Sequence, residues 1–144
     1  VRMAQSAETT VEKAAAVIVN GATLFTISGG PIIIDELIAL CITDNNATAS
    51  TLQFSADGTD GAATTISGAS ASLASAVAGT IVATVPGTLA TAPALYANGV
   101  GIAGTVGIVV PAGIITAVVG VGSTTGTWKF QMRYRPLTSG VLVY

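Results

Sequence analysis

The chain has 144 residues, of which 51% are hydrophobic and only 8% are charged, and its formal net charge is −2. This balance excludes the highly charged, weakly hydrophobic type of disordered chain, and it gives little electrostatic attraction to nucleic acid. The length suits about one domain with its own core, and so apolar a chain is expected to cover part of its surface with partners.

The first strands are predicted on either side of an Asn-Gly pair. Residues 1–12 are polar and have no clear period, so we expect a flexible N-terminal arm and a folded domain over residues 13–144. Residues 15–19 and 22–28 are rich in β-branched and apolar side chains, which favours strands. The Asn-Gly pair between them is a strong hairpin signal, so we expect these two strands to pair with each other.

A long apolar run over residues 32–43 follows a Gly-Gly-Pro break. Its length would also suit a helix, but three consecutive isoleucines and the flanking turn sequences favour a strand. Asp35 and Glu36 interrupt the run, and adjacent residues of a regular strand point to opposite faces. We expect a β-bulge at this acidic pair.

The middle of the chain is rich in alanine, serine, threonine and glycine. Residues 51–56 alternate between apolar and polar side chains, which predicts a strand with one buried face. Residues 70–79 suit a short helix, and residues 80–87 suit a strand that ends at a Pro-Gly pair. Residues 88–104 are predicted as a loop.

The most apolar part of the chain reads as a hairpin. Residues 105–110 and 114–121 are β-branched runs on either side of a Pro-Ala-Gly turn, and glycine and proline cut the run too often for a membrane-spanning helix. No charged residue lies between Asp60 and Lys129. With a last strand at residues 140–144, the sequence predicts an all-β, single-domain fold, either a sandwich or a barrel.

The chain offers little material for catalysis. It contains no histidine and neither a nucleophile elbow nor a phosphate-binding loop. Gly99–Gly104 matches a dinucleotide-binding pattern in form, but a strand-like segment follows where a helix is needed, and no acidic residue follows Asp60. The turn Asp57–Gly61 lacks the glutamate that an EF-hand calcium loop needs at Gly68. We expect no enzyme, no cofactor and no metal site, and we expect the single cysteine, Cys41, to be a small buried hydrophobe.

Residues 125–140 hold three of the five basic residues of the chain, interleaved with aromatic residues. A strand here would bury one face and expose the other. The core face would carry Trp128, Phe130, Met132 and Tyr134, and the exposed face would carry Lys129, Gln131, Arg133 and Arg135. Because cations and aromatic rings are segregated, nucleic-acid binding is not expected.

Two roles suit the cations of this strand. Lys129, Arg133 and Arg135 would either block pairing at an exposed sheet edge or form a docking face for an acidic partner. We expect Arg133 and Arg135 to pair with carboxylates. These acids are either Asp35 and Glu36 of the same chain or carboxylates of a partner protein.

Three segments carry recognisable motifs in a fixed order along the chain. They are LFTISGGPIII at residues 24–34, TLQFSADGT at residues 51–59, and VPAGIITAVVGVGSTTGTWKFQMRYRPLTSG at residues 110–140. This pattern resembles a family of small virion proteins of tailed bacteriophages. In that pattern a GGP strand opens the domain, and a tryptophan-containing strand with an R-Y-x-P-L motif closes it. The resemblance spans most of the chain, and residues 62–94 carry none of its motifs.

The resemblance implies a structural role on the outside of a phage capsid. The chain would be a cement or decoration protein that binds the major capsid protein and stabilises the shell. It would act as a homo-dimer or homo-trimer on the virion surface, after assembly in the host cytoplasm. Proteins of this family are commonly small β-sandwich or jelly-roll domains, so the resemblance implies an all-β, jelly-roll-like β-sandwich here. The family supplies no catalytic residues. No nucleic acid or membrane is expected among its partners.

Two alternatives stay open. A head fibre, spike or adhesin module that binds a host surface would carry clustered aromatic or acidic residues in its loops, and only Tyr96 lies in a predicted loop. A membrane-inserting β-protein is suggested by the high mean hydropathy alone.

Overall fold

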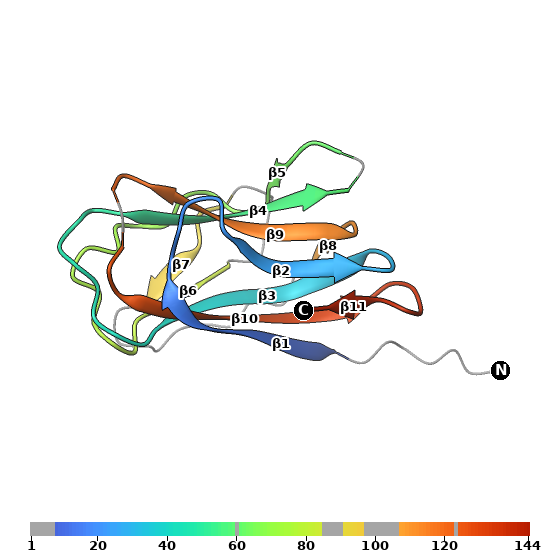
Figure 1. Ribbon diagram of the computed structural model, residues 1–144, viewed down its shortest axis with the longest axis horizontal. Helices are drawn as coiled ribbons and strands as arrows, with labels where there is room; N and C mark the ends of the chain where they lie inside the picture. The colour runs from blue at the N-terminus through green and yellow to red at the C-terminus, as the bar shows by residue number, and fades with distance from the viewer. Residues whose placement is uncertain (1–7, 60, 85–90, 97–106, 123) are drawn as a thin grey trace.

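The computed structural model describes residues 8–59, 61–84, 91–96, 107–122 and 124–144, and the regular elements in these ranges are all β-strands. They form two antiparallel sheets packed against each other, which confirms the predicted all-β sandwich (Figure 1). The jelly-roll connectivity stays a prediction. Within the described ranges, the chain has no helix with the length and apolar character needed to cross a membrane.

Sheet A is built around the aromatic strand predicted near the C-terminus. Its strands in spatial order are β1 (Thr9–Val17), β10 (Thr127–Pro136), β3 (Ile32–Cys41), β6 (Ile81–Ala83) and β7 (Ala94–Tyr96), and β8 (Ile108–Val110) also pairs with β3. Because β10 pairs with β1 on one side and β3 on the other, the prediction that its cations block an exposed sheet edge is wrong.

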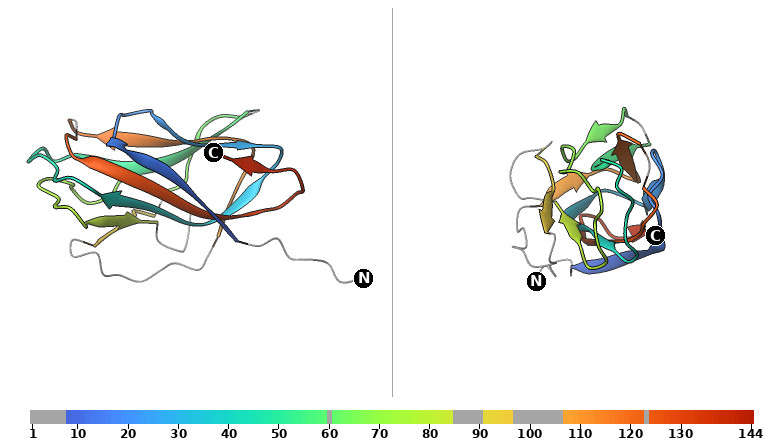
Figure 2. Two further views of the ribbon diagram at one scale, coloured as in Figure 1. Left: turned by 60° about the horizontal axis from the view of Figure 1, so that its bottom comes forward. Right: turned by 90° about the vertical axis from the view of Figure 1, so that its left-hand side faces the viewer.

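Sheet B covers the other side of the core. Its strands in spatial order are β11 (Leu142–Val143), β2 (Thr23–Ser28), β9 (Gly113–Gly120), β4 (Thr51–Gly58) and β5 (Thr64–Thr65). The end-on view in Figure 2 shows the two layers, with β1 and β11 near the same side of the sandwich. Two edges of the molecule are therefore formed by the N-terminal strand and the C-terminal strand.

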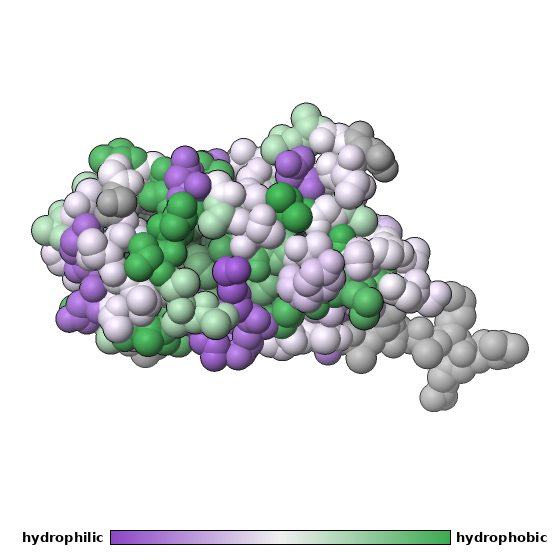
Figure 3. All heavy atoms as spheres, viewed as in Figure 1, coloured by the Kyte–Doolittle hydropathy of each residue, from purple (hydrophilic) through white to green (hydrophobic). Residues whose placement is uncertain are grey.

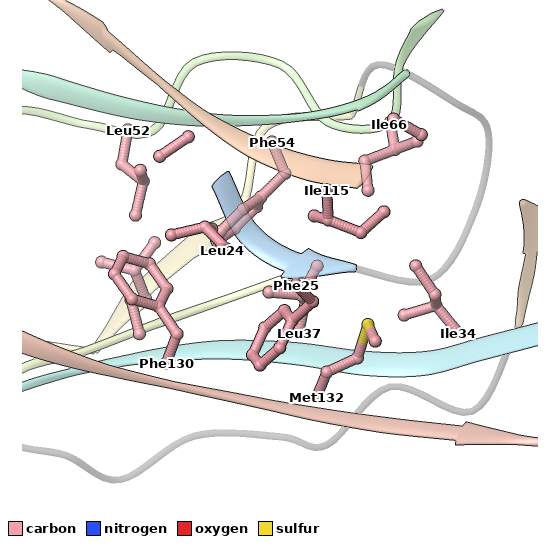
Figure 4. Packing of buried hydrophobic residues seen from close by; sticks show 14 of the residues in the cluster. Leu24, Phe25, Ile34, Leu37, Leu52, Phe54, Ile66, Ile115, Phe130 and Met132 are labelled. Atoms are coloured by element: carbon pink, nitrogen blue, oxygen red, sulfur yellow. The ribbon is translucent and has the colours of Figure 1, made fainter. Parts of the chain in front are cut away.

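The core lies between the two sheets and is filled from strands that alternate buried and exposed residues. Phe54 of β4 and Phe130 of β10 meet edge to face, with ring centroids 6.3 Å apart. In Figure 4, side chains from sheet B point down toward Leu37 and Met132 of sheet A. Trp128 is fully buried, so the predicted core face of β10 is confirmed.

Two predicted hairpins are crossings between the sheets instead. β1 belongs to sheet A while β2 belongs to sheet B, and likewise β8 pairs with β3 while β9 pairs with β2 and β4. The Asn-Gly turn does form, because the Ala22 amide donates to the Val19 carbonyl at 3.0 Å and Gly21 has a φ of 79°. Turn chemistry is local, whereas the core face of each strand decides which sheet it joins.

The predicted boundary of the N-terminal arm at residue 12 is wrong. β1 begins at Thr9, so residues 9–12 pair with β10, and residues 1–7 lie outside the described part of the chain. The sequence misleads here because β1 buries none of its side chains. Residues 9–12 are therefore mostly polar, as in an arm.

The predicted helix over residues 70–79 is also wrong. This segment runs along β4: the Ser70 amide donates to the Leu52 carbonyl at 2.8 Å, and the Leu52 amide donates to the Ser70 hydroxyl at 3.0 Å. The Ser67 hydroxyl accepts from the Phe54 amide in the same way, at 2.9 Å. Serine hydroxyls that bond to the backbone compete with helix formation, and here they cover the edge of β4.

The predicted loop over residues 88–104 contains one strand, β7, within the part that the structure describes. The glycine motif at Gly99–Gly104 and the end of the strand predicted at residues 80–87 lie outside the described residues.

Candidate functional site

The outer face of sheet A gathers four carboxylates and three cations from three neighbouring strands and from the residue that precedes β1. We call this surface the charged face, and its members are Glu8, Glu12, Asp35, Glu36, Lys129, Arg133 and Arg135. Hydrophilic side chains form a band where β1 crosses the molecule in Figure 3, with hydrophobic residues beside it. With four acids against three bases, the charged face is not a basic patch.

A β-bulge places both members of the acidic pair on this face. Arg133 pairs with Glu36, but the next residue of β10, Tyr134, pairs with Ile34, so Asp35 is the extra residue. The predicted bulge is confirmed. It turns two adjacent carboxylates, which would point to opposite faces of a regular strand, toward the same row of cations on β10.

Arg135 and Asp35 form the tightest pair on the charged face. The Arg135 Nε donates to one Asp35 oxygen at 3.0 Å, and Nη2 donates to the other at 2.9 Å. This two-point geometry is the strongest form of an arginine–carboxylate contact. The Asp35 side chain is only 10% exposed, whereas the Arg135 side chain is 43% exposed, so the carboxylate is largely shielded from water while the guanidinium reaches solvent.

The two remaining cations of β10 link it to both of its neighbours. Arg133 lies between Glu36 of β3, at 3.4 Å, and Glu8, at 3.8 Å. Lys129 contacts Glu12 of β1 at 2.9 Å. The prediction that Arg133 and Arg135 pair with Asp35 and Glu36 within the chain is therefore confirmed, while docking of these residues to a partner stays a prediction.

The Arg135 contact changes the acidity of Asp35. The hydrogen bonds from the Arg135 guanidinium hold the pKa of Asp35 below its ordinary value of 3.8, although partial burial opposes the shift. The same contact raises the pKa of Arg135. A carboxyl whose pKa is lower in the folded state stabilises the fold above pH 3.8 and loses that contribution as the pH falls through its folded pKa.

We expect an Asp35→Asn variant to melt at a lower temperature than the wild type at pH 7 and to lose less stability on acidification. Thermal melts at a series of pH values between 7 and 2 measure both effects. Arg135→Gln removes the partner of Asp35 instead, and its melting temperature is also expected to fall less steeply than that of the wild type as the pH is lowered. An acid response of Asp35→Asn as steep as that of the wild type would contradict this assignment.

The outer face of sheet B differs sharply from the charged face. We call it the neutral face, and its members are Thr26, Ser28, Gln53, Ser55, Asp57, Ile114, Thr116, Val118, Leu142 and Tyr144. Asp57 is its single charged side chain among the described residues. Leu142 and Tyr144 are 65% and 69% exposed. The sequence analysis did not predict the neutral face. The sequence feature that could have indicated it is the stretch from residue 61 to residue 128, which contains no charged residue.

A pocket of about 570 Å³ opens between β8 of sheet A and the β4–β5 end of sheet B. Ala56, Ile66, Ile108 and Val110 contribute apolar walls, and no charged side chain is among its described lining residues. Its only side-chain polar groups among the described lining residues are the hydroxyls of Thr59 and Thr64, and none of these described residues is titratable. The described residues also contain no cluster of three or more histidine, cysteine or acidic side chains that could hold a metal ion.

Cys41 is buried at the end of β3, which confirms the prediction made for it. Its Sγ donates to the Thr43 carbonyl at 3.2 Å. Burial, followed by the negative charge of Asp44, raises the pKa of the thiol, so the reactive thiolate form is disfavoured.

Comparisons of the chain with protein-family models, with curated proteins and with solved structures found no match.

Proposed function

We propose that the chain is a structural virion protein that binds the outside of a tailed-phage capsid and stabilises it as a cement or decoration protein. The observation that carries the proposal is the contrast between the two outer faces. Each charged side chain of the charged face has an ionic contact within the chain, such as the contact of Arg135 with Asp35. Between described residues, the neutral face has no such network of ion pairs.

The neutral face is the side that we assign to the capsid. Permanent protein interfaces are depleted in charge and more apolar than transient ones. Burying a surface of threonine, serine and aliphatic side chains avoids the desolvation of unpaired charges, which is costly. Many modest contacts of this kind, repeated by capsid symmetry, give high avidity without a deep pocket.

The resemblance to small virion proteins supports the same role and names the partner as the major capsid protein. The residues that carry the resemblance include β10, whose buried Trp128 and paired Arg135 organise sheet A. In this proposal the motif is architectural: it builds the scaffold that presents the neutral face, and it takes part in no chemistry.

A matched pair of variants tests which face docks. Thr116→Arg puts a charge in the centre of the neutral face, on β9, and is expected to weaken binding to purified capsids by about tenfold or more, because a cation buried without a partner is costly. Gln131→Arg adds the same side chain to the charged face, beside Glu12, and is expected to bind normally. Cosedimentation with capsids that lack the protein measures both.

Thermal melts of the two variants establish that both are folded. The face assignment is wrong if Gln131→Arg weakens capsid binding as much as Thr116→Arg does. The proposed function itself is wrong if the wild-type chain does not cosediment with capsids at all.

A further inference from the structure

β1 is attached to the molecule differently from the other long strands. None of its nine side chains is buried, whereas β10 buries Trp128, Phe130, Met132 and Tyr134 on its core face. Val11 is half-buried and packs at the margin of the core. The hydrophobic effect, which holds the other long strands in place, therefore contributes little to β1.

What holds β1 is its pairing with β10 and the ion pairs of the charged face. Residues Thr9 to Lys13 form an antiparallel ladder with Tyr134 to Phe130. On the outer side, Glu12 contacts Lys129, and Glu12 also accepts from Gln131 at 3.3 Å. Both ends of the Glu12–Lys129 pair are exposed, and exposed ion pairs are weak and screened by salt.

The ladder is interrupted in the middle of β1. Lys13 pairs with Phe130, but the next registered pair is Ala16 with Trp128, so β1 carries one extra residue between them. Ala14 and Ala15 lie in this bulge and are exposed. A short run of small, exposed residues at a break in the ladder is a natural place for the backbone to bend.

We infer that residues 8–13, the exchange segment, pair with β10 of a second copy of this chain. When the segment leaves, it exposes the edge of β10, and an exposed edge recruits another strand. The second copy supplies a strand that fits that edge: its Glu12 and Glu8 meet Lys129 and Arg133, as they do within one chain. Exchange of identical elements is a low-cost route to a dimer because the same contacts are remade.

The geometry allows a reciprocal exchange. Six extended residues reach about 20 Å from the bend, which suffices to cross to a neighbouring copy packed beside β1. The chain directly after β1 stays anchored, since Ile18 is buried and its carbonyl accepts a hydrogen bond from the Thr124 hydroxyl at 3.2 Å. This inference does not depend on capsid binding, so the two proposals can fail separately.

A disulfide trap tests the exchange in the full-length chain. Two singly substituted chains, Glu12→Cys and Gln131→Cys, are made in a Cys41→Ala background, with tags of different size. Glu12 and Gln131 are registered partners of the ladder, at a spacing that suits a disulfide. The two chains are mixed, left to equilibrate and then oxidised. In this mixture, a bond between positions 12 and 131 can form only between chains.

We expect the mixed disulfide dimer to exceed both homodimers several-fold on a denaturing gel. A parallel mixture of Glu12→Cys with Gln53→Cys, which lies on β4 of the other sheet, measures cross-linking by random collision. A mixed dimer no more abundant than the homodimers, or no more abundant than in the Gln53→Cys mixture, would overturn the inference. The doubly substituted single chain confirms the register by forming its bond within the chain at high dilution.

Discussion

A Phe54→Ala variant is expected to lose about 3–5 kcal/mol in the free energy of unfolding, which is the usual cost of truncating a fully buried aromatic side chain. Phe54 has no exposed surface and meets Phe130 edge to face across the core. Phe54 of sheet B therefore packs directly against sheet A. Urea denaturation followed by the fluorescence of Trp128 measures the change.

Gln53→Ala is the matched control for this prediction. Gln53 is the neighbour of Phe54 on β4 and lies on the outer face, so its replacement is expected to change the free energy of unfolding by no more than about 0.5 kcal/mol. Equal effects of the two variants would mean that the faces of β4 are assigned the wrong way round.

A Gly113→Ala variant is expected to destabilise the fold by about 3 kcal/mol or more, from steric overlap and backbone strain together. Gly113 has a φ of 152°, which favours glycine, and a Cβ at this position would overlap the backbone carbonyl oxygen of Asp57. The neighbour that would have to move is the backbone of β4, the pairing partner of β9. The same denaturation curves measure the loss.

Gly21→Ala separates the two causes. Gly21 also has a positive φ, of 79°, but a Cβ there would meet no atom within 4 Å. Its replacement is expected to cost only the left-handed backbone strain, about 1–2 kcal/mol. If Gly113→Ala is no worse than Gly21→Ala, the close approach of β9 to β4 is not as tight as described.

The elements that could be predicted from the sequence are those specified by alternation within one strand. Trp128, Phe130, Met132 and Tyr134 fall on the core face of β10 as predicted, and the bulge at Asp35 follows from an acidic pair inside an apolar strand. In both places the signal is local, because the period of two residues fixes the face of each side chain.

The errors arose where the outcome depends on distant parts of the chain. The Asn-Gly turn signal was correct for Gly21, but β1 and β2 join different sheets because their partners are β10 and β9. Likewise, the alanine- and serine-rich segment has local helix preference, yet Ser67 and Ser70 find better partners along β4. Local propensity is a weak guide wherever a sheet edge offers such bonds.

The candidate site could be predicted only in part. The internal pairing of Arg133 and Arg135 with the acids of β3 was one of two alternatives, and the structure selects it. The contribution of Glu8 and Glu12 was missed, because both lie in residues assigned to an arm. With these two acids, each β10 cation has an acidic partner within the chain, so the proposed docking surface lies on the other sheet.

The most direct test of the proposed function is the survival of capsids under heat and osmotic shock with and without this protein. We predict that capsids lacking the chain rupture at a lower temperature and at a milder osmotic step. Adding the purified wild-type chain should restore resistance, and adding Thr116→Arg should not. Equal survival of complete and depleted capsids would contradict the account, and specific, saturable binding of the chain to host cells in that case would favour a head fibre or adhesin module instead.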